Sequence, residues 1–208
     1  MSSALTGMAG VVLAGGKSRR MGRDKRFLEV GGRSMLDRVC AVMGPLFPEC
    51  LLSVAEPNPH LEGLHCRIVT DVIPGCAALG GLYAALSASS HHRIFVVGCD
   101  MPFISSASIR RVVELSGDCD VVMLELATGL QPMHAVYSKD CLPFMRQLIQ
   151  DRNLKIQALA HLSDLKVRIL KEQEVISTPD DLLSFFNINT PTDLEFARKL
   201  AGKARSGI

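Results

Sequence analysis

The chain has 208 residues, of which 48% are hydrophobic and 21% are charged, and its formal net charge is +2. This composition excludes intrinsic disorder, which requires low hydrophobicity and high net charge, and the balanced charge argues against a nucleic-acid-binding surface. The length predicts a single domain over residues 1–208, with an ordered core over about residues 8–202.

Cysteine usage and the absence of targeting patterns suggest a compartment. The seven cysteines are odd in number and form no CxxC pair, which disfavours a disulfide framework or a zinc site and is typical of reducing conditions. The N-terminal segment lacks a basic region before its short apolar run, and no apolar run reaches the roughly 18 residues of a membrane span. We therefore expect a cytoplasmic protein without membrane association.

Strand and helix patterns alternate along the chain. Short apolar runs predict strands at residues 8–13, 51–54, 67–70, 93–98, 120–124, 131–137 and 167–170. Helical spacing and capping residues predict helices at about residues 34–43, 80–89, 105–115, 139–150 and 190–201. Such alternation is typical of βαβ crossovers, so we expect a single doubly wound α/β domain whose mostly parallel sheet carries helices on both faces.

Glycines and cations follow the first predicted strand directly. Gly15 and Gly16 allow the backbone to approach a ligand closely, and five Lys or Arg residues occur among the nine residues 17–25. Ligands bind at the carboxyl ends of strands in open α/β sheets, so this segment predicts a polyphosphate site in preference to a solvated basic loop. It is not a P-loop, because Val11 stands where the first glycine of that motif belongs.

Residues 13–25 match the pattern LAGGxSxRMGxDK at every fixed position. This segment resembles the signature of the molybdenum cofactor guanylyltransferases, the MobA family of nucleotidyltransferases. The segments CDMPF at 99–103, QPMHAVY at 131–137 and NINTP at 187–191 are similar to further family segments. The resemblance implies a Rossmann-like, GT-A-like fold and transfer of GMP from GTP to the terminal phosphate of molybdopterin, with release of pyrophosphate. It also implies nucleotide contacts from Leu13, Ala14, Gly15 and Gly16.

Two aspartates end predicted strands. Asp100 follows the most apolar strand, and a carboxylate beside a polyphosphate is placed to hold Mg²⁺, or Mn²⁺ in its place; the alternative is an N-cap of the next turn. Asp71 matches a family residue that contacts the nucleotide, and the alternative is a plain turn aspartate. Gly80 belongs to a glycine loop that opens a helix, whose N-terminus could face an anion or the base.

The implied nucleophile is the acceptor phosphate itself, which is already an anion. Catalysis then requires positioning and charge neutralisation, without a covalent enzyme intermediate. We expect Arg20 and Lys25 to bind and neutralise the phosphates, and Asp100 to hold the metal.

Four residues are expected on the acceptor side from the resemblance: Gln131, His134, Asn187 and Asn189. His134 lies inside an apolar strand, where a packed core residue is the alternative. Asn187 and Asn189 flank Ile188 with strand spacing and would share one face, and the alternative is turn and capping work before Pro191.

Two departures from the family pattern fall on the base-recognition side. Residues 77–81 lack the proline of the GPLxG segment, and Ala55 or Glu56 stands where relatives carry an asparagine. A cytidylyltransferase acting on molybdopterin or on another phosphorylated acceptor therefore remains an alternative to a guanylyltransferase. Arg20, Lys25 and Asp100 argue against a nucleotide-binding module without activity. The resemblance also implies GTP and molybdopterin as substrates and cofactor-delivery or acceptor proteins as partners; we expect no nucleic-acid partner.

Overall fold

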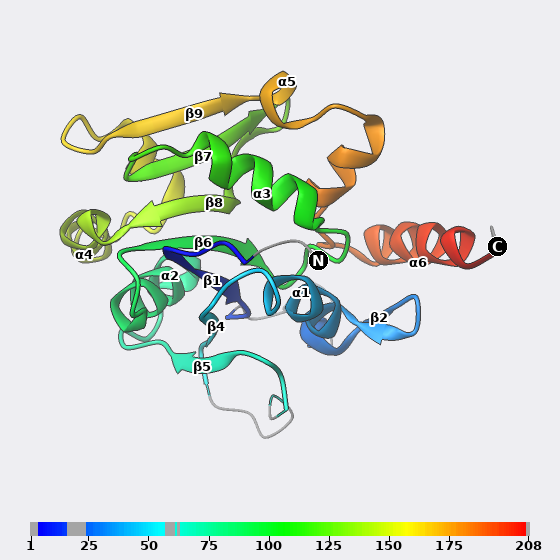
Figure 1. The fold of residues 1–208 in the computed structure, drawn as a ribbon. Coiled ribbons are helices and arrows are strands. Elements are labelled where there is room, and N and C mark those ends of the chain that lie inside the picture. The colour runs from blue at the N-terminus through cyan, green and yellow to red at the C-terminus, as the bar shows by residue number, and fades with distance from the viewer. Residues whose placement is uncertain (1–3, 16–23, 57–60, 62, 207–208) are drawn as a thin grey trace.

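The computed structural model describes residues 4–15, 24–56, 61 and 63–206. A seven-stranded sheet in the order β5-β4-β1-β6-β8-β7-β9 forms its centre (Figure 1). Six of these strands run parallel and β8 runs antiparallel to both of its neighbours, which confirms the predicted mostly parallel sheet. The strands are β1 Met8–Leu13, β4 Cys50–Val54, β5 Arg67–Thr70, β6 Arg93–Gly98, β7 Val121–Leu126, β8 Gly129–Ser138 and β9 Val167–Lys171.

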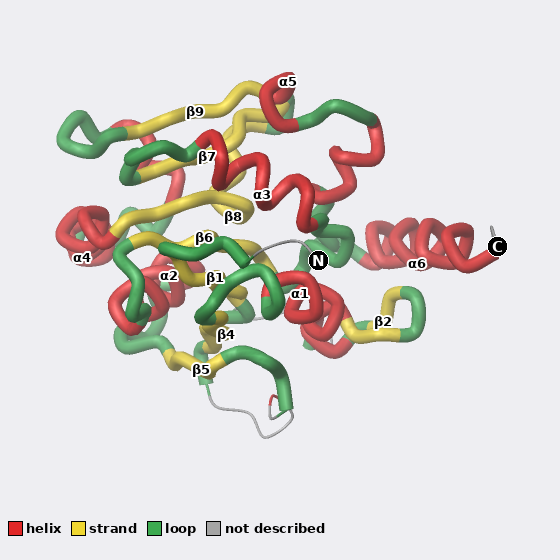
Figure 2. Tube along the Cα trace, in the orientation of Figure 1, coloured by secondary structure: helices red, strands yellow, loops and turns green. Residues whose placement is uncertain are grey.

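Helices cover both faces of the sheet, as predicted (Figure 2). The helices α1 (Met35–Met43) and α3 (Ser106–Leu115) pack on one face, and α2 (Ala77–Ala88) and α4 (Leu142–Gln150) pack on the other. The remaining elements are η1 Lys25–Phe27, β2 Glu29–Val30, β3 Arg33–Ser34, η3 Lys139–Cys141, η4 Ile156–His161, α5 Glu172–Val175, η5 Pro179–Phe185 and α6 Pro191–Ser206. No helix in the described part of the chain has the length and apolarity to cross a membrane.

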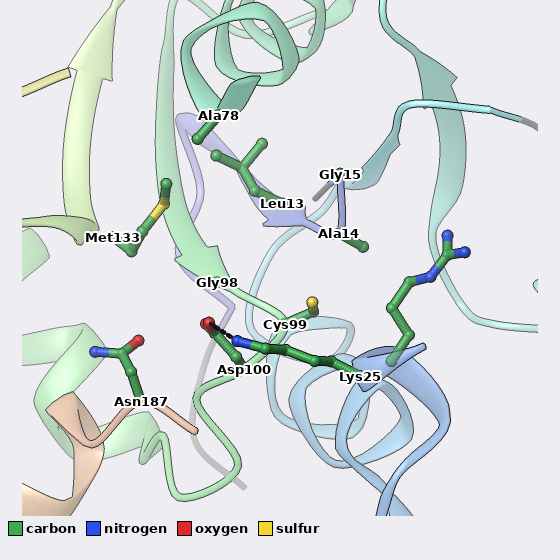
Figure 3. A pocket seen from close by; sticks show the side chains of 11 residues that line it. Leu13, Ala14, Gly15, Lys25, Ala78, Gly98, Cys99, Asp100, Met133 and Asn187 are labelled. Atoms are coloured by element: carbon green, nitrogen blue, oxygen red, sulfur yellow. Dashed lines mark ion pairs between the residues drawn. The ribbon is translucent and has the colours of Figure 1, made fainter. Parts of the chain in front are cut away.

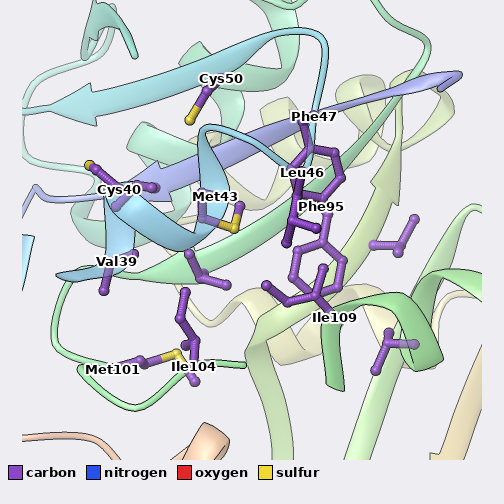
Figure 4. Packing of buried hydrophobic residues seen from close by; sticks show 14 of the residues in the cluster. Val39, Cys40, Met43, Leu46, Phe47, Cys50, Phe95, Met101, Ile104 and Ile109 are labelled. Carbon is purple, nitrogen blue, oxygen red and sulfur yellow. The ribbon is translucent and has the colours of Figure 1, made fainter. Parts of the chain in front are cut away.

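The apolar runs of the central strands are continuous because both faces of each strand are buried. In β1, Val12 joins the cluster under α1 and α3, whereas Val11 and Leu13 join the cluster under α2 and α4. In the first cluster the rings of Phe47 and Phe95 stack with their centroids 6.0 Å apart (Figure 4). This two-sided core fixes the strands whose carboxyl ends carry the predicted site.

A third, smaller cluster attaches α6 to the β2–β3 ribbon. It contains Val30, Met35, Ile188, Leu194, Ala197 and Ala201. The start of α6 is capped as predicted: the Asp193 carboxylate accepts from the backbone amides of Asn189 (2.9 Å) and Thr190 (2.7 Å), and the Thr190 hydroxyl accepts from the amide of Asp193 (3.2 Å). This cap fixes the residues just before α6 next to the segment that contains Lys25.

Several element boundaries differ from the predicted ones. Helix α2 begins at Ala77, three residues before the predicted start at Gly80, and α6 continues beyond residue 201 to Ser206. The β2–β3 ribbon, η4, α5 and η5 were not predicted, because short elements of this kind have no hydrophobic period of their own.

Candidate nucleotide-transfer site

A pocket with a volume of about 230 Å³ opens at the carboxyl ends of β1 and β6, where Leu13 pairs with Gly98 (Figure 3). This edge of the sheet is the one where open α/β folds bind ligands. The lining residues come from the β1 and β6 ends, η1, the start of α2, β8 and the segment before α6. They are Leu13, Ala14, Gly15, Lys25, Arg26, Ala78, Gly98, Cys99, Asp100, Met133 and Asn187.

The Lys25 ammonium group lies at the centre of the charged part of this pocket. Its Nζ donates to the backbone carbonyl of Ile188 and to the Oδ1 of Asn189, both at 2.9 Å. The carboxylate of Asp100 lies 3.9 Å from the same Nζ (Figure 3). The lysine side chain is 17% exposed, so protein groups replace most of the water around it. The structure thus brings together Lys25 and Asp100, two residues that we expected in the phosphate and metal site.

Asp100 is held rigidly between β6 and the start of α6. Its backbone carbonyl accepts from the amide of Ile188 at 2.9 Å. A Cβ on Gly98 would lie 2.6 Å from the Oδ1 of Asp100, so a larger residue at that position would displace the carboxylate. Burial raises the pKa of the Asp100 carboxyl, and the charge of Lys25 acts in the opposite direction. A cation bound next to Asp100 would favour the ionised carboxylate and would therefore lower this pKa.

Asp100 is suited to be the protein ligand of a metal ion whose other ligands are substrate phosphates and water molecules. Among the described residues no group of three or more His, Cys, Asp or Glu side chains is arranged to hold a metal. Mg²⁺ usually binds one or two carboxylates together with substrate phosphates and waters, and a single carboxylate oxygen donor fits that habit. Asp100 would therefore hold Mg²⁺ or Mn²⁺ together with the phosphates of a bound nucleotide.

The turn after β1 is fixed between its two neighbouring strands. The amide of Ala14 donates to the carbonyl of Ser53 (2.8 Å), and the carbonyl of Leu13 accepts from the amide of Cys99 (3.0 Å). A Cβ on Gly15 would lie 3.4 Å from the backbone nitrogen of Ala55, so the two segments approach closely. Leu13, Ala14 and Gly15, for which the resemblance implies nucleotide contacts, line the pocket. Gly16 and Arg20 lie outside the described residues.

Helix α2 begins at the pocket, with Ala78 in its lining. Its N-cap residue, Cys76, makes no side-chain hydrogen bond to the first turn, and Ala77 has a φ of +49°. Unsatisfied N–H groups and the positive end of the helix dipole favour an anion or a polar ligand edge here. This agrees with the expected orientation of the helix.

Asp71 and Gly80 lie side by side but do not line the pocket. A Cβ on Gly80 would lie 2.8 Å from the Cβ of Cys76 and 3.9 Å from the Oδ2 of Asp71, so this glycine serves close packing. The Oδ1 of Asp71 is buried without a hydrogen-bond partner, because the adjacent Ser53 hydroxyl donates to the carbonyl of Gly81 (3.1 Å). Desolvation raises the pKa of Asp71.

The four residues expected on the acceptor side are separated by the structure. Asn187 lines the pocket, and its Nδ2 donates to the carbonyl of Phe185 at 3.0 Å. Asn189 instead accepts a hydrogen bond from Lys25 through its side-chain oxygen. The two asparagines belong to a loop before α6 and not to a strand. Gln131 donates to Thr128 and Gly129 in the β7–β8 turn, outside the pocket lining.

His134 is a core residue. It is fully buried, and its ring lies 4.4 Å from that of Phe185 and 5.2 Å from that of Phe95, between ring centroids. Burial lowers the pKa of its imidazole to about 3, so the ring is neutral at physiological pH. His134 does not line the pocket, and its neighbour Met133 does. The structure therefore favours the alternative that His134 is a packed core residue over the expectation that it contacts the acceptor.

The pocket also contains residues that sequence reasoning missed, chiefly Arg26, Cys99, Met133 and Ala78. Arg26 forms a forked ion pair with Asp24 at 2.6–3.0 Å, and this side-chain hydrogen bond lowers the pKa of Asp24. Asp24 is a fixed position of the signature segment, so the signal for a structural acid at this place was present in the sequence. Cys99 and Ala78 are small residues that line the pocket because the fold places their backbone beside it. Local sequence patterns do not reveal this position.

Three features lie together at the carboxyl ends of the strands in this mostly parallel sheet: a glycine turn, a lysine–aspartate pair and the N-terminus of α2, which has no side-chain cap. This combination is typical of a nucleotide-binding α/β protein. Residues 10–166 match the family model of the MobA-like NTP transferase domain. The chain belongs to this family.

Named relatives agree along nearly the full length. The chain is 38% identical to a probable molybdenum cofactor guanylyltransferase of Pelotomaculum thermopropionicum, over 95% of each chain. It is 33% identical to the molybdenum cofactor guanylyltransferase of Desulfosudis oleivorans, over 91% of this chain and 94% of the relative. Its fold matches the crystal structure of molybdopterin-guanine dinucleotide biosynthesis protein A from Archaeoglobus fulgidus with a TM-score of 0.80 and 25% identity, over 94% and 100% of the two chains. The family resemblance found in the sequence is thus confirmed.

Proposed function

We propose that this protein transfers GMP from GTP to the terminal phosphate of molybdopterin and releases pyrophosphate. The observation that carries the proposal is the Lys25–Asp100 pair, fixed by Ile188 and Asn189 at the carboxyl end of β6. The relatives of Pelotomaculum thermopropionicum and Desulfosudis oleivorans, whose names state this activity, support it over more than nine-tenths of the chain.

The reaction joins two anions, so the main task of the site is to reduce their repulsion. Lys25 supplies a positive charge in a largely desolvated position, where charge–charge interactions are stronger than in bulk water. Arg20 is expected to assist with a planar fork that bridges two phosphate oxygens. The amides of the turn at Gly15 and of the first turn of α2 would accept further negative charge.

Asp100 would hold Mg²⁺, and the ion would supply positive charge to the phosphate oxygens as a Lewis acid. The loop before α6 holds both residues of this pair, since the Ile188 carbonyl accepts from Lys25 and the Ile188 amide donates to the backbone carbonyl of Asp100. The attacking acceptor phosphate requires no general base, since it is already ionised. Asn187 lines the same pocket and is the candidate for contact with the acceptor.

The base would be read on the β4–β5 side, where the buried Oδ1 of Asp71 has no hydrogen-bond partner. A carboxylate can accept from the N1–H and N2–H₂ edge of guanine, which cytosine lacks. A cytidylyltransferase remains the second candidate, because Ala55 or Glu56 stands where the family resemblance implies an asparagine, and Ala55 has no side-chain donor or acceptor.

The protein would act as one domain and in the cytoplasm, where its seven free thiols are chemically compatible with reducing conditions. Partner proteins that deliver the cofactor or receive the product fit this role, because a free molybdopterin cofactor would have to be passed on.

The test is pyrophosphate release from each of the four nucleoside triphosphates in the presence of Mg²⁺ and molybdenum cofactor. We expect release with GTP, and only when the acceptor is added. Equal release with all four nucleotides, or release without acceptor, would contradict the proposal.

A further inference from the structure

Three of the seven cysteines are grouped near the amino ends of β4 and β5, whereas the pocket lies at the carboxyl ends of the strands. Cys40 lies on α1, Cys50 is the first residue of β4, and Cys66 directly precedes β5. The parallel pairing of β4 with β5 starts at Leu51 and Arg67, so Cys50 and Cys66 occupy the preceding register position. Directly paired residues point to the same face of a sheet, and here this is the face covered by α1.

Packing and contacts bear out this arrangement. Cys40 and Cys50 are both buried in the cluster between α1 and the sheet (Figure 4). Cys66 packs against that cluster. Cys40 is 4% and Cys50 8% exposed, whereas Cys66 is partly exposed. A small dissolved reagent therefore reaches Cys66 first.

The contacts also prepare Cys66 for reaction. The neighbouring thiols of Cys40 and Cys50 lower the pKa of Cys66, although burial acts in the opposite direction. The same contact with Cys66 raises the pKa of the other two thiols. A partly exposed thiol with a lowered pKa beside two buried thiols is the arrangement of a redox-sensitive cysteine with a resolving partner.

We propose that Cys66 is a site of oxidation by peroxides and that Cys50 resolves the oxidised sulfur as a disulfide. In the first step the Cys66 thiolate attacks the peroxide, an S–O bond forms, the O–O bond breaks, and hydroxide or alkoxide leaves. In the second step the Cys50 sulfur attacks the sulfenic acid, the S–S bond forms, and the hydroxyl group leaves as water with the thiol proton.

Strand geometry selects Cys50 over Cys40 as the partner. Neighbouring strands lie about 4.8 Å apart, within the roughly 4.4–6.8 Å between Cα atoms that a disulfide spans. Cys40 approaches from the helix layer above the sheet and not from a paired strand. A metal site is the less suitable interpretation, because no group of three such ligands among the described residues is arranged to hold an ion.

The first experiment uses the wild-type protein. It is treated with one equivalent of hydrogen peroxide at neutral pH, the remaining thiols are alkylated, and the digested protein is mapped by mass spectrometry. We expect a Cys50–Cys66 peptide pair, while Cys119, a partly exposed cysteine that does not belong to the group of Cys40, Cys50 and Cys66, is recovered in alkylated form. A Cys40–Cys66 pair, or oxidation of Cys119 at the same rate, would overturn the proposal.

Variants test the role of each thiol. Cys66→Ser should abolish disulfide formation, whereas the matched control Cys119→Ser should leave it unchanged. In the Cys40→Ser/Cys50→Ser double variant, shown to be folded by thermal unfolding, a 1,3-dione probe should label a persistent sulfenic acid on Cys66. Failure of the probe to label Cys66 there would contradict the first step.

Two further measurements separate this site from the transfer reaction. At pH 6, peroxide should oxidise Cys66 faster than Cys119 in the wild-type protein, because Cys66 is partly exposed and the neighbouring thiols lower its pKa. Because the cluster lies at the amino ends of β4 and β5, Cys66→Ser should leave pyrophosphate release from GTP within about twofold of wild type, a change of under ~0.5 kcal/mol.

Discussion

The substitution Asn189→Ala removes a hydrogen-bond acceptor of the Lys25 ammonium group. Among the described residues the carbonyl of Ile188 also accepts from this group at 2.9 Å, whereas Asp100 lies 3.9 Å away, beyond hydrogen-bonding distance. The Lys25 side chain is 17% exposed, so water replaces the lost acceptor incompletely. A hydrogen bond to a charged group contributes about 1.5–3 kcal/mol, which corresponds to a loss of about 10- to 150-fold in kcat/KM.

The assay is pyrophosphate release from GTP with saturating Mg²⁺ and acceptor, for Asn189→Ala and Lys25→Ala separately and combined. Lys25→Ala should lower the rate by about 10²–10³, as for the loss of a group that stabilises charge in the transition state. If Asn189 acts through Lys25, its removal from the Lys25→Ala enzyme should change the rate by less than about twofold. Asn153→Ala, at an exposed asparagine after α4, is the matched control and should behave as wild type.

This reasoning would be refuted if the fold-loss in activity of the double variant equalled the product of the fold-losses of the two single variants. It would mean that Asn189 contacts a substrate independently of the lysine, which is the role expected from the sequence pattern.

Three further predictions test other parts of the structure. Gly98→Ala places a Cβ 2.6 Å from the Oδ1 of Asp100 and should weaken Mg²⁺ activation by about 10- to 100-fold, whereas Gly202→Ala, whose Cβ meets nothing within 4 Å, should leave the Mg²⁺ titration unchanged. Desolvation raises the pKa of Glu49, but hydrogen bonds from neighbouring side chains outweigh it and lower this pKa to about 2, below the ordinary 4.5. The stabilisation by Glu49 is therefore present above about pH 5 and lost as the pH falls toward 2. Urea unfolding should show that Glu49→Gln removes about 1–2 kcal/mol at pH 7 and much less at pH 2.5, and an equal loss at both pH values would contradict the assignment. Ala55→Asn should increase the preference for GTP over CTP by about 2- to 13-fold in a competition assay, the effect of one hydrogen bond; an unchanged ratio would show that this position does not read the base.

The central part of the sheet was predictable because its strands are defined by local patterns. Residues 8–13 and 93–98 were predicted with the observed bounds, since both are continuous apolar runs that the core buries on two sides. The start of α6 was predictable from Thr190 and Asp193, whose side chains cap the helix. The reversed direction of β8 was not predicted, because direction depends on which strands pair and not on the pattern within one strand.

The charged centre of the site was predictable as residue types but not as contacts. Lys25 and Asp100 were identified from their places after β1 and β6, and the sheet brings them together. The hydrogen bonds from Lys25 to Ile188 and Asn189 join residues that are 163 and 164 positions apart in the sequence. No local sequence pattern predicts a contact between segments so far apart. His134 illustrates the opposite case, where an apolar strand pattern correctly suggested the core and the motif suggested a ligand.

The most direct test of guanylyl transfer at this pocket compares wild type with Asp100→Asn. The amide preserves the size of the carboxylate and removes the charge that would hold the metal. We predict that wild type releases pyrophosphate from GTP in a reaction that requires Mg²⁺ and molybdenum cofactor, and that the folded Asp100→Asn enzyme loses this activity. Near-normal Mg²⁺-dependent activity in Asp100→Asn would contradict the assignment of the reaction to this site.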